Sequence, residues 1–212
     1  MQIQRIVKGT HRRYRVDIEY RGMELTMPLY GTELKTYSIE EGAELPDEVY
    51  ERICDEILYK RAMDYTLYLL GAKSYTEKEM ACKLIGAYYS EPVISRTLSK
   101  LIEYRFIDDA QYASDFTSQA SRTKSKRVIK QLLLQKGISR DTVEATLKAS
   151  PGDDTALALL VARRTRGGDL RDPAFYSRQV RYLLGKGFDY DEIICALNWA
   201  RDSMEDGLST QD

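Results

Sequence analysis

The chain has 212 residues and a formal net charge of -1, and 43% of its residues are hydrophobic. This is the composition of an ordinary soluble protein, with enough apolar residues for one large or two small cores. The near-zero net charge excludes an argument for nucleic-acid binding from bulk charge alone. The charges are nevertheless uneven, because residues 32–60 hold nine acids and three bases whereas residues 121–130 hold five bases and no acid.

We expect neither a membrane-spanning or secreted chain nor one held together by disulfides or a metal. No run approaches the roughly eighteen apolar residues of a membrane span, and the N-terminal MQIQRIVKGT lacks the apolar stretch of a signal peptide. We therefore expect a cytoplasmic protein. Cys54, Cys82 and Cys195 are few, odd in number and widely spaced, so we expect buried, reduced thiols and neither a disulfide framework nor a metal site.

A small antiparallel sheet is predicted at the N-terminus. Residues 14–20 (YRVDIEY) alternate large apolar and charged side chains, and residues 24–29 (ELTMPL) partly repeat this alternation after the turn signal Arg21-Gly22. Residues 3–7 can supply a third strand. A sheet this small is only marginally stable alone, so we expect this N-terminal extension, residues 1–45, to pack against the helices that follow.

The rest of the chain is predicted to be helical. Pro46 followed by two acids marks a helix start, and Thr76 with Glu79 forms a capping box. The expected helices are 46–70 with a break near Leu58 and a stop at Gly71, 77–88, one opened by Ser90 and Pro92 that ends near Glu103, 109–120, one around 128–133 that stops at Gly137, 139–147, 154–164, 173–184 and 189–200.

An internal repeat organises these helices. Residues 132–147 and 182–197, 50 residues apart, share six of sixteen positions, and a degenerate third copy occupies residues 83–98. Three copies at one period predict stacked three-helix units with a long curved binding surface. We expect a mostly α protein, elongated and curved, with repeats at 46–104, 105–150 and 151–201 and a flexible tail at 202–212.

The repeated turn has a physical basis. Lys136-Gly137 and Lys186-Gly187 place a cation in the last helical turn and a glycine where the chain enters the left-handed region. The next residue, Ile138 or Phe188, is expected to fill the core. Tyr88 stands at the glycine position of the first copy, which predicts a strained or differently closed turn. The linker 150–153 (SPGD) allows some movement between repeats.

Catalytic constellations are not recognisable in the sequence. The single histidine, His11, is expected to be a solvated loop residue, and Asp108-Asp109 fits a helix cap better than a metal or acid-base pair. A glycine-rich phosphate loop is missing as well. We therefore expect a protein that is not an enzyme and needs no cofactor and no metal.

Two groups of basic residues are the strongest functional signal, and they predict contact with DNA phosphates or with an acidic protein surface. A solvated helix face is the simpler alternative. The sixteen tyrosines, among them Tyr65, Tyr68, Tyr88, Tyr89 and Tyr104, are expected to pack in or near the core, with an interface as the alternative. The candidate binding residues are Arg122, Lys124, Lys126, Arg127 and Lys130 in the first group, and Arg163, Arg164, Arg166 and Arg171 in the second.

Several motifs follow one another in a characteristic order. They are residues 62–70 (AMDYTLYLL), Thr76 to Met80 (TEKEM) with Lys83-Leu84, Leu101 followed by Phe106 to Asp109 (FIDD), Tyr112-Ala113, and residues 133–139 (LLQKGIS). This order resembles the RecX family, the bacterial regulators of the RecA recombinase. The resemblance covers residues 51–197 and departs from the family pattern at Tyr88 and at Ser74-Tyr75.

This resemblance implies a cytoplasmic monomer without enzymatic activity that acts in homologous recombination, DNA repair and the SOS response. It implies that the protein binds RecA, lies along the groove of the RecA–DNA filament and suppresses ATP hydrolysis and strand exchange. An alternative remains, because three-helix units with such a turn also resemble helix-turn-helix modules of stand-alone DNA-binding proteins.

Overall fold

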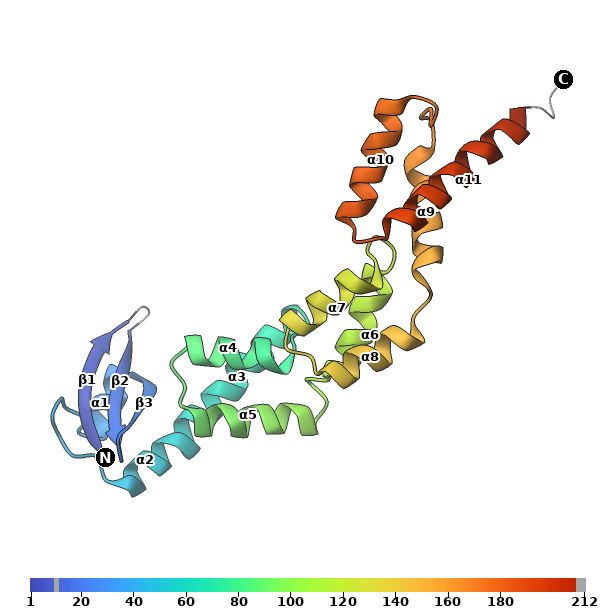
Figure 1. The fold of residues 1–212 in the computed structure, drawn as a ribbon. Helices are drawn as coiled ribbons and strands as arrows, with labels where there is room; N and C mark the ends of the chain where they lie inside the picture. The colour runs from blue at the N-terminus through green and yellow to red at the C-terminus, as the bar shows by residue number, and fades with distance from the viewer. Residues whose placement is uncertain (10–11, 209–212) are drawn as a thin grey trace. The chain divides into compact units, whose positions relative to one another are not determined.

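The computed structural model describes residues 1–9 and 12–208, with side chains described through residue 203. The expectation for His11 therefore lies outside the described residues. Contacts divide the chain into two compact units, residues 1–108 and 109–212. The fold is mostly α-helical with one three-stranded sheet, as predicted (Figure 1).

The sheet forms the start of the first unit. Strands β1 (Gln2–Lys8), β2 (Arg13–Tyr20) and β3 (Met23–Tyr30) pair antiparallel in the order β1-β2-β3. The predicted turn is present, because Arg21 and Gly22 both have positive φ, as tight hairpin turns require. Alternate side chains of the sheet enter the core, namely Ile3, Val16, Ile18, Met27 and Leu29.

The sheet packs against helices, as expected from its small size. Helix α1 (Gly31–Thr36) follows β3 directly, and the next helical stretch consists of α2 (Asp47–Ile53), the π-helical turn η1 (Cys54–Leu58) and α3 (Tyr59–Ala72). The predicted break near Leu58 is thus a π-helical turn within a continuous helical run. The stop predicted at Gly71 is two residues early, because this glycine lies inside α3 and Lys73 is the C-cap.

Helices α4 (Glu77–Gly86) and α5 (Glu91–Glu103) follow, and with α3 they form the three-helix group of the first unit. The predicted capping box is confirmed: the Glu79 amide donates to Thr76 Oγ1 at 3.2 Å, and the Thr76 amide donates to Glu79 Oε2 at 3.3 Å. One core joins the sheet and these helices, and its fully buried side chains include Leu58, Met80 and Leu84.

The second unit holds two further three-helix groups. The first comprises α6 (Asp109–Ala120), α7 (Lys126–Gln135) and α8 (Arg140–Ala149), and the second comprises α9 (Asp153–Thr165), α10 (Pro173–Gly185) and α11 (Tyr190–Leu208). Each group has its own core. The cores centre on Ile129, Leu133 and Val143 in the first group and on Leu160, Leu183, Phe188 and Ile193 in the second.

All three copies of the repeated turn close in the same way. The turn residue has a positive φ in each copy: 69° for Tyr88, 92° for Gly137 and 89° for Gly187. The tyrosine is therefore the strained member, because its Cβ makes this backbone region unfavourable whereas glycine adopts it freely. The residue that follows is buried in each copy and its amide donates to a carbonyl five residues earlier, from Tyr89 to Leu84 at 3.2 Å, from Ile138 to Leu133 at 3.2 Å and from Phe188 to Leu183 at 3.4 Å.

The prediction that all three cysteines are buried is wrong. Cys54 is buried, but Cys82 and Cys195 are exposed. The helical period explains the difference. Cys82 lies midway between the buried Met80 and Leu84, and Cys195 lies midway between two buried residues of α11, so both point to the opposite side of their helices.

The expectation for the tyrosines holds only in part. Tyr89 is buried, but Tyr68, Tyr88 and Tyr104 rank among the exposed large side chains, with Tyr68 78% accessible.

Within the described residues, no helix has both the length and the apolarity to cross a membrane.

Candidate functional site

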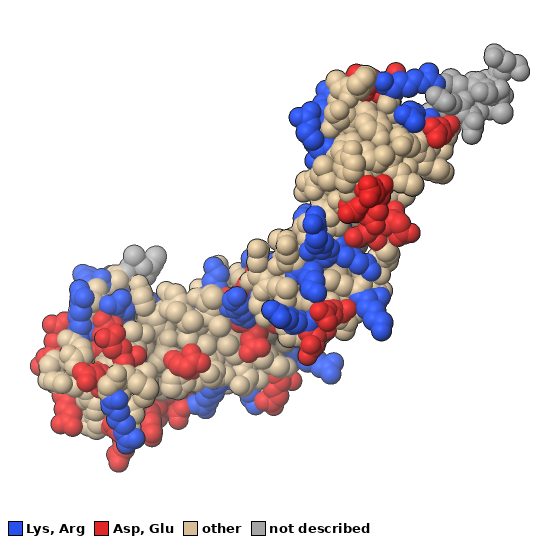
Figure 2. All heavy atoms as spheres, viewed as in Figure 1, with Lys and Arg blue, Asp and Glu red and all other residues tan. Residues whose placement is uncertain are grey.

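The nine predicted binding residues all lie in the second unit. They occupy four local settings: the turn between α6 and α7, the N-terminal half of α7, the end of α9 and the loop after it. Figure 2 shows Lys and Arg side chains on the visible face of this unit, with acidic side chains beside them. Because each setting gives its cations different partners, the residues are taken in turn.

The turn between α6 and α7 carries Arg122 and Lys124. Backbone hydrogen bonds fix this turn, since the Ser121 amide donates to the Thr117 carbonyl at 2.8 Å and the Lys124 amide donates to the Ala120 carbonyl at 2.9 Å. Arg122 is exposed and Lys124 is partly buried. Neither side chain forms an ion pair or hydrogen bond with another residue in the described part of the unit, so both can meet an external anion.

Lys126, the first residue of α7, has an internal structural role. Its Nζ donates to the carbonyl oxygens of Leu147 and Ser150 at 2.7 and 3.0 Å, where it satisfies acceptors at the end of α8. Its backbone amide donates to Asp153 Oδ1 at 2.8 Å. These contacts tie the 150–153 linker to α7. Because the Lys126 ammonium is already hydrogen-bonded inside the unit, it is not available to bind a partner.

Arg127 and Lys130 also have partners inside the unit. Arg127 donates from Nη2 to the Gly187 carbonyl at 3.3 Å, which joins α7 to the repeated turn of the next helix group. Lys130 pairs with Glu144 at 3.1 Å, and both side chains are largely exposed. An exposed pair of this kind contributes little to stability, so Lys130 can exchange its partner at low cost.

The second predicted group divides in the same manner. Arg164 donates from Nε to Gln179 Oε1 at 3.1 Å and its guanidinium lies 4.1 Å from the centre of the Tyr182 ring. Arg163 and Arg166 are exposed and form no ion pair within the described residues. Arg171 lies in the loop after α9, where its backbone amide donates to Asp169 Oδ1 at 2.9 Å.

Two further exposed arginines on α10 were not predicted. Arg178 lies 5.7 Å from the Phe175 ring, and Arg181 donates from Nε to its own helix at the Ser177 carbonyl, at 3.4 Å. Their three-residue spacing on one helix was a readable signal. With Arg163 and Arg166 they extend the basic character of the last helix group from α9 onto α10.

The arrangement of these exposed cations suits the binding of anions. Guanidinium and ammonium groups on an open surface recognise phosphates or carboxylates. No group of three His, Cys, Asp or Glu residues that could hold a metal ion occurs within the described residues. The fold and this surface together define a helical-repeat protein with an exposed basic surface.

Comparison with known proteins gives the family. The family model of the RecX first three-helix domain matches residues 62–101, and that of the RecX second three-helix domain matches residues 108–147. The regulatory protein RecX of Caldanaerobacter subterraneus subsp. tengcongensis is 30% identical over 162 residues, which cover 76% of this chain and 81% of that protein. The chain belongs to the RecX family.

A further relative and two solved structures agree with this membership. The regulatory protein RecX of Streptococcus pneumoniae (strain Hungary19A-6) is 32% identical over 173 residues, or 79% of this chain and 66% of that protein. A crystal structure of RecX from Lactobacillus salivarius, 25% identical, matches with a TM-score of 0.56 over 68% of this chain and 96% of that one. A crystal structure of a regulatory protein RecX, 22% identical, shares the fold with a TM-score of 0.56 over 90% of this chain and 96% of that one.

Proposed function

We propose that this protein regulates the RecA recombinase by binding RecA and the RecA–DNA filament, and that it inhibits ATP hydrolysis and strand exchange without catalysing a reaction itself. The observation that carries the proposal is membership of the RecX family, whose relatives are named regulatory proteins. RecA as the partner follows from what the resemblance of the motifs to this family implies.

The contacts in the second unit narrow the surface that would meet the filament. Among the nine predicted residues, four have side chains with neither an ion pair nor a hydrogen bond within the described residues: Arg122, Lys124, Arg163 and Arg166. Lys126, by contrast, holds α7 to the end of α8. We assign the filament contact to the former four and a scaffolding role to Lys126.

The proposal is tested by the RecA ATPase on single-stranded DNA, measured with increasing amounts of the protein. Inhibition at or below equimolar ratio to RecA is the expected result. An unchanged rate at several-fold excess over RecA would refute the proposed function. Strand exchange between single-stranded DNA and a homologous duplex, measured at the same ratios, reports whether inhibition extends to recombination.

A charge-reversal variant assigns the surface. Arg122→Glu with Lys124→Glu should weaken inhibition of RecA and reduce its dependence on salt concentration, because fewer counterions would be displaced. The matched control is Arg52→Glu with Lys60→Glu, which makes the same change of net charge at exposed positions of the first unit. If the control weakens inhibition as much as the test variant, bulk charge and not this surface governs binding.

A stand-alone helix-turn-helix DNA-binding protein is the competing function. Its distinguishing property is tight, sequence-dependent binding to duplex DNA in the absence of RecA. Electrophoretic mobility shifts with several unrelated duplexes at physiological salt separate the two. A strong preference for one duplex, together with no effect on the RecA ATPase, would favour the competing function.

A further inference from the structure

A hollow of about 220 Å³ lies in the first unit, between the sheet and the helices. It is smaller than a pocket that encloses a drug-sized ligand, so it can hold a small group such as one phosphate while the rest of a larger ligand lies against its exposed rim. Its walls combine cationic and aromatic side chains, and they come from β2, β3, α3 and the strained turn after α4. The residues that matter for its chemistry are Arg13, Tyr14, Arg15, Pro28, Tyr65 and Tyr88.

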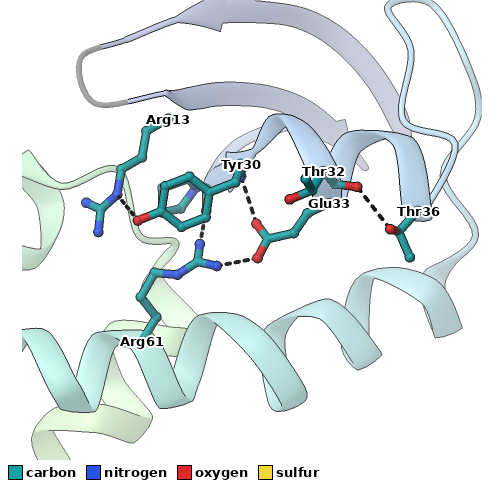
Figure 3. Close-up of polar contacts among 7 residues, drawn as sticks. Arg13, Tyr30, Thr32, Glu33, Thr36 and Arg61 are labelled. Atoms are coloured by element: carbon teal, nitrogen blue, oxygen red, sulfur yellow. Dashed lines mark hydrogen bonds and ion pairs between the residues drawn. The ribbon is translucent and has the colours of Figure 1, made fainter.

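Arg13 brings an unneutralised positive charge to this hollow. Its Nε donates to the Tyr30 hydroxyl at 3.4 Å, and Figure 3 shows its two terminal nitrogens directed away from that tyrosine. Neither terminal nitrogen has a hydrogen-bond or ion-pair partner within the described residues. Arg13 therefore keeps the paired donors with which a guanidinium binds an oxyanion.

The neighbouring cations are already neutralised. Arg61 pairs with Glu33, donates from Nη1 to the Pro28 carbonyl at 3.0 Å and lies 4.5 Å from the Tyr30 ring centre (Figure 3). Arg15 pairs with Asp17 at 2.8 Å. These ion pairs hold the walls in place, and the net charge that they leave at the hollow is that of Arg13.

A buried hydroxyl beside Arg13 adds a second polar group without a partner. Tyr89 is 3% accessible, and no residue in the described part of the chain forms a hydrogen bond with its hydroxyl. Burial raises the pKa of Tyr89, while the nearby charges of Arg13 and Arg61 act in the opposite direction. A buried hydroxyl without a partner is unfavourable, but Tyr89 does not line the hollow, so we assign it no contact with the ligand.

Tyr88 supplies an aromatic surface at an energetic cost to the backbone. The two other copies of the turn hold glycine at the same positive φ, so a tyrosine here is not needed for turn closure. The ring is 45% accessible and its centre lies 5.5 Å from the Arg15 guanidinium. Backbone strain of this kind concentrates at functional sites, where the side chain has a use that offsets it.

We propose that this hollow binds one nucleotide, with the phosphate on Arg13 and the base against Tyr88. Arg13 matches the phosphate through its paired donors, and base stacking on an aromatic ring tolerates any base. A carboxylate would use Arg13 but not the aromatic wall, which is why we assign a nucleotide. The nucleotide is either a free nucleoside monophosphate or one unit of a single strand, and binding does not require RecA.

Calorimetric titration of the full chain with thymidine monophosphate, and anisotropy with a fluorescein-labelled oligothymidylate, test this site without RecA. Arg13→Gln and Tyr88→Gly should each weaken binding about tenfold or more. Tyr88→Gly is the sharper variant, because glycine holds the same φ in the other two turns and the fold should be retained. Arg5→Gln, an exposed arginine on β1 outside the hollow, is the matched control and should bind as wild type does.

The source of the nucleotide follows from which probe binds. Binding of both probes with equal sensitivity to Tyr88→Gly identifies a free nucleotide as sufficient, whereas binding of the oligonucleotide alone, with the same sensitivity, identifies a strand. Both results support the site. Binding of neither probe, wild-type affinity in Arg13→Gln and Tyr88→Gly, or displacement by an oligoglutamate peptide without a nucleotide preference would overturn it. Arg13→Lys, which retains the charge, replaces Arg13→Gln if circular dichroism shows that the latter is unfolded.

Discussion

The backbone amide of Ser125 donates a hydrogen bond to the carbonyl oxygen of Lys186 at 3.0 Å. Ser125 occupies the N-cap position of α7 and Lys186 the C-cap position of α10, so a helix start in one three-helix group meets a helix end in the next. This pairs an orphan donor with an orphan acceptor from two helices. The repeated turn thus has a second role in the second unit, because it joins adjacent groups as well as closing one.

Close packing at this junction makes Gly187 intolerant of a side chain. A Cβ at Gly187 would lie 2.3 Å from Val128 Cγ2 and 2.6 Å from Ser125 Oγ, in addition to the strain of φ +89°. We expect Gly187→Ala to lower the free energy of unfolding by about 2–4 kcal/mol, as the sum of backbone strain and overpacking. Urea unfolding followed by circular dichroism measures the change.

The control for this substitution is Gly167→Ala in the same unit. Gly167 also has a positive φ, +77°, but nothing lies within 4 Å of its would-be Cβ. Only the backbone strain, about 1–2 kcal/mol, should appear. Equal losses for the two variants would show that the packing of the repeated turn against α7 contributes nothing measurable.

Substitutions at Lys126 should lower stability, whereas substitutions at Arg122 and Lys124, in the turn before α7, should weaken binding alone. Lys126→Met removes the ammonium that satisfies two carbonyls at the end of α8, and we expect it to lower the free energy of unfolding by about 1–3 kcal/mol. Arg122→Gln with Lys124→Gln should leave stability within about 0.5 kcal/mol, because these side chains have no internal partner. Thermal unfolding of both variants, set beside their inhibition of RecA, checks this division, and a stable but inactive Lys126→Met would contradict it.

Stability should fall at alkaline pH partly through Tyr50. Burial raises the pKa of Tyr50 to about 12, and its hydroxyl donates to Ser90 Oγ at 3.2 Å. An unfolded tyrosine titrates near pH 10. Between about pH 10 and 12 the unfolded chain therefore loses this proton while the folded chain retains it, so the stabilisation present below pH 10 is lost as the pH rises.

The measurement is the urea midpoint from pH 8 to pH 12 for the wild type and for Tyr50→Phe. The variant loses one hydrogen bond at neutral pH but should show a shallower alkaline decline. A decline as steep as that of the wild type would mean that Tyr50 does not titrate in this range or that its environment is not dry in solution.

The cysteines should react in two classes. Cys82 and Cys195 are exposed, whereas Cys54 is buried and burial raises the pKa of its thiol. Because the thiolate is the reactive form, we expect two thiols to react rapidly with a chromogenic disulfide in the folded protein and the third only after unfolding. Cys54→Ser should leave the rapid amplitude unchanged, while three rapid thiols in the wild type would contradict the buried position of Cys54.

The local architecture was readable from the sequence because it depends on near neighbours. Alternation in residues 14–20 gave a strand, the Thr76 and Glu79 pair gave a helix start, and the glycines at 137 and 187 gave turns with positive φ. Each of these depends on side-chain direction or backbone freedom within a few residues. The repeat and the family motifs extended this to the order of the helices.

The state of individual side chains was decided by the tertiary structure. Sequence spacing placed Lys126 on a basic helix face, but the end of α8 comes close enough to accept its hydrogen bonds. The helical period alone could have placed Cys82 outward, yet its apolar surroundings in the sequence favoured burial. Tyr88 keeps the conformation of a glycine where β2 and β3 meet the turn, with Arg15 near its ring and Thr26 Oγ1 donating to its carbonyl at 3.1 Å.

The sequence by itself therefore determined the helices, the sheet, the repeated turn and the family, since periodicity and turn chemistry act over short distances. Only the tertiary structure decided which cations keep an unpaired charge and where Arg13, Tyr88 and Tyr89 come together. The physical reason is that a charge or hydroxyl takes its energetic role from the partners around it, and those partners come from segments far apart in the chain.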